Sequence, residues 1–119
     1  MQDEQLWQYL EQEDIASIQH YDEFKTFQRE EKGKLGALKY YKEGTMTFKP
    51  TYKYEAMKSE YDMKREPAYT DRIFFEARYP LPQQNPLMNI YYGDVQYHLS
   101  DHMPITGLFE AKIKVQNQD

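Results

Sequence analysis

Residues 105–115, with the sequence ITGLFEAKIKV, alternate between two kinds of side chain, and this pattern constrains the fold more than any other feature of the chain. Successive side chains of a β-strand point to opposite faces of the sheet. The stretch is therefore predicted to be a strand with one apolar and one polar face, with Leu108 as the exception. The apolar set is Ile105, Gly107, Phe109, Ala111, Ile113 and Val115, and the other set is Thr106, Glu110, Lys112 and Lys114.

The first part of the chain predicts helix. In residues 4–30 the apolar side chains recur with the spacing of one helix face, and the segment SIQHYDEF is where this helix could divide into two. The following segment EEKGKLGA contains two glycines and predicts a loop. The apolar positions of the helix are Leu6, Leu10, Ile15 and Ile18, continued by Phe24 and Phe27.

Between these two ends the chain predicts short strands separated by loops, because β-branched and aromatic runs alternate with segments rich in glycine, proline or charge. The prolines of PLPQQNP place residues 80–86 in a surface loop. The predicted strands are 45–48, after a turn at Gly44 and before Pro50, then 71–79, and then two strands within 87–99 joined by a turn at Gly93 and Asp94; segment 55–69 is a predicted loop.

Aromatic side chains make up 16% of the chain and include 12 Tyr, so much of the core must consist of rings with polar tips. The predicted strands carry such rings on both faces. A single helical layer can cover only one face of a sheet, and the other face then needs a second layer. The sequence therefore predicts a mixed α+β architecture that is part of a larger fold.

Composition also limits the classes of function. The chain has no cysteine, which excludes disulfide and thiolate chemistry and suits an intracellular protein. No run approaches the roughly 18 apolar residues of a membrane span, and the acidic start MQDEQLWQYL differs from a basic secretory signal. The net charge of -5 argues against nucleic acid as a partner. These features lead us to expect a cytoplasmic protein.

The segment LSDHMPI contains the first candidate site residues, Asp101 and His102. A histidine here could act as a general acid or base, and the aspartate could bind a divalent metal such as Mg²⁺. The alternative is that Asp101 caps a turn and His102 is an ordinary surface residue.

Two further segments carry candidates. In PAYTDRIFF, Asp71 and Arg72 form either a surface ion pair of little consequence or a carboxylate that orients an imidazole, with Arg72 holding the loop. The segment FKPTYKYEAMKSEYDMKREPAY is either a solvated charged loop or a phosphate-binding loop. In the second case the donors would be Tyr52, Lys53, Lys64 and Arg65.

Taken in order, the motifs F-x-P-T-Y-K-Y, Y-D, R-x-P-A-x-x-D-R-I and S-D-H-x-P resemble the C-terminal part of the inositol polyphosphate 5-phosphatases, within the deoxyribonuclease I-like superfamily of Mg²⁺-dependent phosphoesterases. The resemblance is specific from Glu43 to about Val115. It implies that residues 1–119 form the C-terminal half of a four-layer α/β sandwich, with a mixed, mostly antiparallel sheet packed with helices. Residues 1–30 would be helical, and residues 43–115 would supply strands and active-site loops.

The resemblance also implies a role for each candidate residue. His102 would contact the scissile phosphate, Asp71 would orient His102, and Asp101 would lie near the Mg²⁺ or the attacking water as a metal ligand. The substrate-binding residues would be Tyr52, Lys53 and Arg65, at positions that bind the 4-phosphate of the inositol ring, together with Lys64 and with Arg72, which would support the active-site loop.

The chain departs from this family in several places. The family usually has P-A-W-C-D-R, whereas Tyr69 and Thr70 stand here for the Trp and the Cys. Met63 occupies the place of a frequent lysine, which Lys64 could replace, and the loop 77–92 is longer than expected. The family's metal-binding Glu and its W-x-G-D-x-N-x-R segment do not occur. We therefore expect the chain to lack the N-terminal half of the catalytic domain and to be inactive alone.

The function implied for the parent protein is Mg²⁺-dependent hydrolysis of the 5-phosphate of phosphoinositide lipids or soluble inositol phosphates. Contact with membranes would be peripheral and would occur through the substrate. Two alternatives remain open. One is a non-catalytic module that binds inositol phosphates, and the other is a nuclease of the same superfamily, against which the T-Y-K-Y segment and the negative charge argue.

Overall fold

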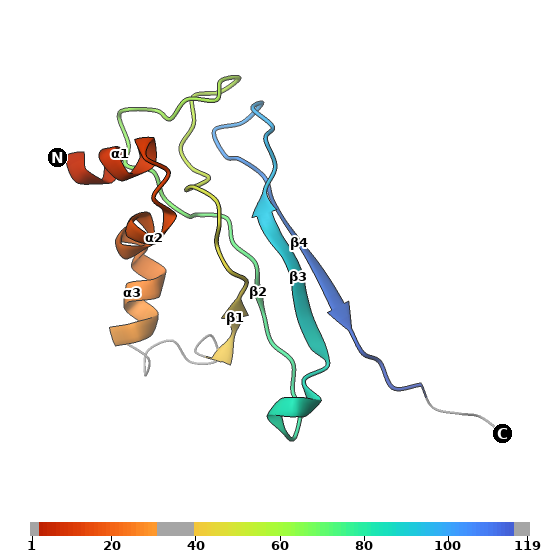
Figure 1. Cartoon of the computed structure of the whole chain (residues 1–119). Coiled ribbons are helices and arrows are strands. Elements are labelled where there is room, and N and C mark those ends of the chain that lie inside the picture. Colours follow the sequence, from red (N-terminus) through yellow and green to blue (C-terminus); the bar gives the residue numbers. More distant parts are fainter. Residues whose placement is uncertain (1–2, 31–39, 116–119) are drawn as a thin grey trace.

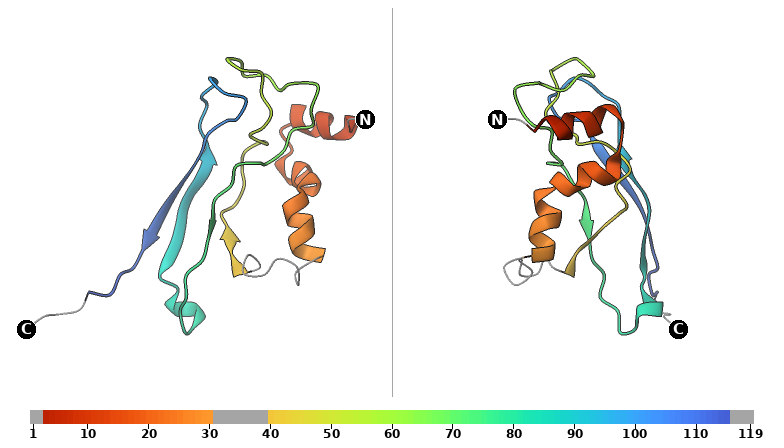
Figure 2. Two further views of the ribbon diagram at one scale, coloured as in Figure 1. Left: turned by 180° about the vertical axis from the view of Figure 1, so that it is seen from behind. Right: turned by 60° about the vertical axis from the view of Figure 1, so that its left-hand side comes forward.

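The computed structural model describes residues 3–30 and 40–115. Its elements are α1 (Glu4–Glu11), α2 (Ile15–Ile18), the 3₁₀ helix η1 (Gln19–Tyr21), α3 (Glu23–Glu30), β1 (Lys42–Glu43), β2 (Phe74–Phe75), the 3₁₀ helix η4 (Pro82–Gln84), β3 (Leu87–Asp94) and β4 (Ile105–Ala111). The helices lie on one side of the molecule, β1 and β2 in the middle, and the long β3–β4 ribbon on the other side (Figure 1, Figure 2).

The helix predicted over 4–30 is divided into three α-helices. Asp14 accepts a hydrogen bond from the backbone N–H of Ser17 at 3.2 Å and so caps α2. The predicted division within SIQHYDEF is confirmed, because η1 and Asp22 separate α2 from α3. The break before Asp14 was not predicted, since the apolar spacing continues across it. The side chain of Phe27 lies outside the described residues.

β3 and β4 form an antiparallel ribbon with a β-bulge between Asn89 and Tyr91. The predicted turn at Gly93 and Asp94 is wrong, because both residues pair with β4 inside the ribbon. The chain reverses within 95–104 instead. The predicted pair of strands over 87–99 is therefore a single strand.

The alternation predicted for the last strand is confirmed from Ile105 to Glu110, whereas Ala111, the last residue of β4, is exposed. The backbone N–H of Lys112 donates to the carbonyl of Pro86 at 2.7 Å. Because Pro86 has no N–H, it cannot donate a bond in return, and the ladder stops there. Ile113 and Val115, which were predicted to share the apolar face, are 81% and 83% exposed.

The strand predicted over 45–48 is also wrong, because β1 precedes Gly44 and pairs antiparallel with β2. Met46 and Phe48 are buried, so this segment contributes to the core through its side chains. A Cβ atom at Gly44 would lie 3.0 Å from the Cβ of Tyr92. Only glycine lets the backbone approach β3 so closely. Of the strand predicted over 71–79, only Phe74 and Phe75 are confirmed, as β2.

One hydrophobic core lies between the helices and the middle segments, and its rings pack edge to face, Phe48 against both Tyr69 and Tyr92. The outer surface of the ribbon is different, since its large apolar side chains Met88, Ile90, Tyr91 and Leu108 are more than half exposed. This distribution agrees with the predicted fold class, a partial α/β sandwich. Within the described ranges, no helix has the length and apolarity needed to cross a membrane. The buried core residues are Leu6, Leu10, Ile18, Met46, Phe48, Tyr69 and Tyr92.

Candidate active site

Three segments that are far apart in the sequence meet at Tyr52. Its backbone forms antiparallel bridges with Ala68 on one side and with His102 on the other. The bridges are closed by backbone hydrogen bonds, among them Ala68 N–H to the carbonyl of Tyr52 at 2.8 Å and Met103 N–H to the carbonyl of Thr51 at 2.7 Å. The motifs TYKY, PAYTDR and SDH therefore lie side by side.

This arrangement brings together Asp71 and His102, which the sequence analysis selected as an orienting pair. Nδ1 of His102 lies 2.5 Å from Oδ2 of Asp71. The ring of Tyr52 lies against the imidazole, with 4.5 Å between the ring centroids. Both side chains of the pair remain about 40% exposed, at 41% and 43%. With Nδ1 engaged by the carboxylate, Nε2 is the nitrogen that remains for a substrate.

Asp101 lies on the other side of the imidazole. Its Oδ1 is 4.0 Å from Nε2 of His102 and accepts a hydrogen bond from the Ser100 hydroxyl at 3.2 Å. In the part of the chain that the structure describes, no three His, Cys, Asp or Glu side chains are grouped so as to hold a metal ion. Asp101, the predicted metal ligand, therefore supplies one carboxylate, and the described residues around it do not complete a metal site.

The predicted phosphate-binding residues occupy the loop beside Tyr52. Arg65 donates from Nη1 to the Tyr52 hydroxyl at 3.3 Å, and Nζ of Lys53 lies 3.2 Å from Oδ2 of Asp62. Lys64 lies on the exposed part of the loop, where its backbone N–H donates to Asp62 Oδ1 at 2.9 Å. The structure thus pairs Arg65 with Tyr52 and Lys53 with Asp62, and Lys64 is exposed.

Asp62, which is not among the predicted site residues, contacts two of the basic residues of this loop, Lys53 and Lys64. The hydrogen bond from the backbone N–H of Lys64, together with the nearby Lys53, holds the pKa of Asp62 below its ordinary value. The carboxylate therefore stays ionised and fixes Lys53. The signal available in the sequence was the Y-D pair, which was used only as a family motif.

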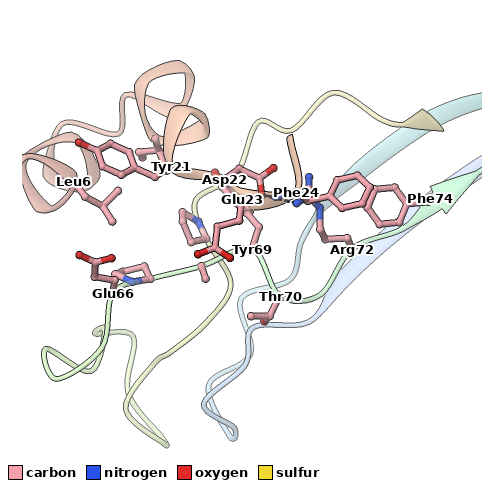
Figure 3. A pocket seen from close by; sticks show the side chains of 14 residues that line it. Leu6, Tyr21, Asp22, Glu23, Phe24, Glu66, Tyr69, Thr70, Arg72 and Phe74 are labelled. Atoms are coloured by element: carbon pink, nitrogen blue, oxygen red, sulfur yellow. Dashed lines mark hydrogen bonds and ion pairs between the residues drawn. The ribbon is translucent and has the colours of Figure 1, made fainter. Parts of the chain in front are cut away.

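The substrate-binding role predicted for Arg72 is corrected by the structure. Its guanidinium donates to both oxygens of Glu43, at 2.9 and 2.6 Å, and to Asp22 Oδ1 at 2.7 Å. It also lies over the rings of Phe24 and Phe74, 5.1 and 5.4 Å from the centroids (Figure 3). The Arg72 side chain is only 7% exposed, and its guanidinium is directed to Glu43 and Asp22 instead of to a substrate.

Asp71 and Arg72 are neighbours in the chain, but their side chains contact different parts of the molecule. Asp71 faces His102, and Arg72 faces the helices, where it binds the residue that precedes α3 and the end of β1. Arg72, Asp22 and Glu43 thus form a buried ionic anchor one residue from Asp71. This anchor is compatible with the role predicted for Arg72, which is to support the active-site loop.

Glu43 makes the anchor dependent on pH. Burial alone would raise the pKa of Glu43, but hydrogen bonds from Arg72 and the Tyr92 hydroxyl outweigh it, and the pKa lies below its ordinary value of 4.5. A lowered pKa in the folded state gives stability that is present at neutral pH and is lost as the pH falls through that pKa.

We expect the difference in Tm between the native chain and Glu43→Gln to be largest near neutral pH and to shrink towards pH 3. Circular dichroism melts across this range measure it, and a constant difference would contradict the role of the Glu43 charge.

Comparison with known proteins agrees with the motifs. The model of the Endonuclease/Exonuclease/phosphatase family 2 matches residues 1–108. Inositol polyphosphate 5-phosphatase K of Mus musculus is 33% identical over 91 residues, which cover 64% of this chain and 19% of that protein. Type IV inositol polyphosphate 5-phosphatase 11 of Arabidopsis thaliana is 40% identical over 81 residues, 66% of this chain and 23% of the relative. The chain thus spans about a fifth of the length of these two relatives.

Solved structures are similar over almost the whole chain. The inositol polyphosphate 5-phosphatase domain of SPsynaptojanin, in complex with inositol (1,4)-bisphosphate and calcium ion, is 25% identical with a TM-score of 0.72, covering 93% of this chain and 32% of that one. A Cimex nitrophorin is 21% identical with a TM-score of 0.78, covering 95% and 38%, which shows a shared fold alone. The resemblance inferred from the motifs is confirmed, and the chain belongs to the Endonuclease/Exonuclease/phosphatase family 2.

Proposed function

We propose that this chain is the C-terminal part of the catalytic domain of a Mg²⁺-dependent inositol polyphosphate 5-phosphatase. The observation that carries the proposal is the Asp71–His102 pair, with the basic side chains of Lys53 and Arg65 in the adjoining loop. The names of the similar proteins support the substrate class, an inositol phosphate or a phosphoinositide. A cytoplasmic location, with peripheral contact to membranes through a lipid substrate, belongs to the same proposal.

In the proposed reaction, water attacks the 5-phosphate in line and the phosphoryl oxygens gain negative charge. Nε2 of His102 donates a hydrogen bond to one of these oxygens, and Asp71 stabilises the positive charge of the ring from the Nδ1 side. Tyr52, Lys53 and Arg65 hold a neighbouring phosphate and so orient the ring. Mg²⁺ would neutralise charge on the phosphoryl group. Among the described residues, the carboxylate of Asp101 would be its ligand.

The chain by itself is expected to bind inositol phosphates without hydrolysing them, because Lys53 and Arg65 offer positioned donors while the described residues form no complete metal site. The test has two parts, both with the purified 119-residue chain. Titration with inositol 1,4-bisphosphate should shift the backbone amide signals of Tyr52, Lys53 and Arg65. Incubation with Mg²⁺ and either phosphatidylinositol 4,5-bisphosphate vesicles or inositol 1,4,5-trisphosphate should release no phosphate above the blank.

The outcomes separate the candidate functions. Binding without turnover agrees both with an incomplete catalytic domain and with a binding module. Phosphate release by a longer chain distinguishes these two functions. Robust phosphate release by this chain would contradict its incompleteness. Specific nicking of DNA by a longer chain, without release of inositol-bound phosphate, would assign it to the nucleases.

A further inference from the structure

The hydroxyl of Thr70 lies beside the Asp71–His102 pair. Oγ1 of Thr70 donates to Oδ2 of Asp71 at 3.0 Å and lies 3.4 Å from Nδ1 of His102. The same oxygen of Asp71 faces Nδ1 of the histidine. Among the residues that the structure describes, Thr70 and His102 are the groups that contact this carboxylate. The orientation of Asp71 therefore depends on Thr70 as well as on the histidine that it is meant to orient.

Hydrogen-bond chemistry fixes where the protons of this triangle lie. An ionised carboxylate only accepts, and a threonine hydroxyl has one proton to donate. If the Thr70 proton goes to Asp71, Nδ1 of His102 must also carry a proton to interact with the same oxygen. In the neutral ring, Nε2 then carries no proton and can only accept a hydrogen bond. In the imidazolium form, Nε2 also carries a proton and donates it.

Solvent makes such an orienting group necessary. The Asp71 side chain is 43% exposed, so water competes for both oxygens and the carboxylate can rotate. Thr70 is β-branched, which restricts its χ1 angle and presents the hydroxyl in few orientations. The resembled family usually has cysteine at this place, and a thiol is a weaker donor than a hydroxyl.

We propose that Thr70 is a positioning residue, whose hydroxyl fixes the Asp71 carboxylate towards Nδ1 of His102. The proposal rests on the proposed function for its meaning in catalysis. The Thr70–Asp71 hydrogen bond itself is independent of that function, because the hydroxyl contacts Asp71 whether or not a substrate is turned over. Thr70 lines the edge of a cavity of about 490 Å³ between the helices and the segment that contains Tyr69 and Arg72 (Figure 3). Substitutions of similar size are thus accommodated.

The experiment compares Thr70→Val, which keeps the shape and removes the hydroxyl, with Thr70→Ser, which keeps the hydroxyl and removes a methyl group. The 119-residue chain is labelled for NMR, and three-bond couplings give the χ1 populations of Asp71. We expect one dominant rotamer in the native chain and in Thr70→Ser. In Thr70→Val the ratio of that rotamer to the others should fall about fivefold, the effect of one hydrogen bond.

The control is Thr106→Val, an exposed threonine in β4, which should leave the Asp71 couplings unchanged. Unchanged couplings in Thr70→Val, or a native chain whose Asp71 already averages among rotamers, would overturn the proposal. If Thr70→Val does not fold, averaging of Asp71 in folded Thr70→Ser would overturn it, and native couplings there would support it. None of these measurements uses a substrate. A chain that binds no inositol phosphate would therefore contradict the proposed function and leave the conclusion about Thr70 and Asp71 unchanged.

Discussion

Arg72→Ala is expected to lower the free energy of unfolding by about 3–5 kcal/mol, because it removes the guanidinium that is bonded to two buried carboxylates. The side chains of Asp22 and Glu43 are only 5% and 3% exposed, and Arg72 is bonded to both. Domains of this size are stable by roughly 5–15 kcal/mol. The loss should therefore be a large fraction of the total stability, and urea titration followed by circular dichroism measures it.

Two variants control for the loss of a positive charge alone. Arg78→Ala removes an exposed arginine and should change the stability by less than about 0.5 kcal/mol. Arg72→Lys keeps the charge but cannot bridge both carboxylates with a planar fork, so its stability should fall between the other two. If Arg72→Ala were as stable as Arg78→Ala, the buried anchor would have no energetic role.

Asp71→Asn is expected to lower kcat about 10³- to 10⁴-fold in a catalytic domain that contains this segment together with its N-terminal half. The amide has nearly the shape of the carboxylate but carries no charge, so it cannot stabilise a protonated His102. Loss of the equivalent carboxylate in a serine-protease triad has an effect of this order. Phosphate release from inositol 1,4,5-trisphosphate at saturating Mg²⁺ measures kcat.

His102→Ala should abolish turnover to a similar extent, and the double variant should be no worse than the poorer single variant, because the two residues act as a unit. Asp94→Asn is the matched control, since Asp94 lies at the end of β3 and accepts a hydrogen bond from Gln96 at 2.9 Å. Full activity of Asp71→Asn, or additive losses in the double variant, would contradict the orienting role.

The candidate site was more predictable than the fold around it. Asp71 and His102 could be selected because a histidine in a polar loop needs a carboxylate, and the ordered motifs indicated which one. Tyr52, Lys53 and Arg65 followed from the same motifs. Their roles remain proposals, and what the structure adds is that all five residues lie around one backbone segment.

The errors in the fold share one physical cause. Gly93 and Asp94 have the composition of a turn, yet they pair with β4, because strand pairing stabilised them more than a local turn did. Gly44 likewise predicts a turn, although it is the place where the chain passes close to Tyr92. Local sequence signals describe what a residue can do, and long-range neighbours decide which option is used.

The sequence by itself determined the order of helices and strands, the alternation of the last strand, and the family, because these depend on spacing along the chain. Only the tertiary structure decided the role of Arg72. Whether an arginine next to Asp71 faces a substrate or a buried pair of carboxylates depends on Asp22 and Glu43, which are distant in sequence. The direction of a charged side chain is fixed by the partners that compensate its burial, and those partners are known only once the chain is folded.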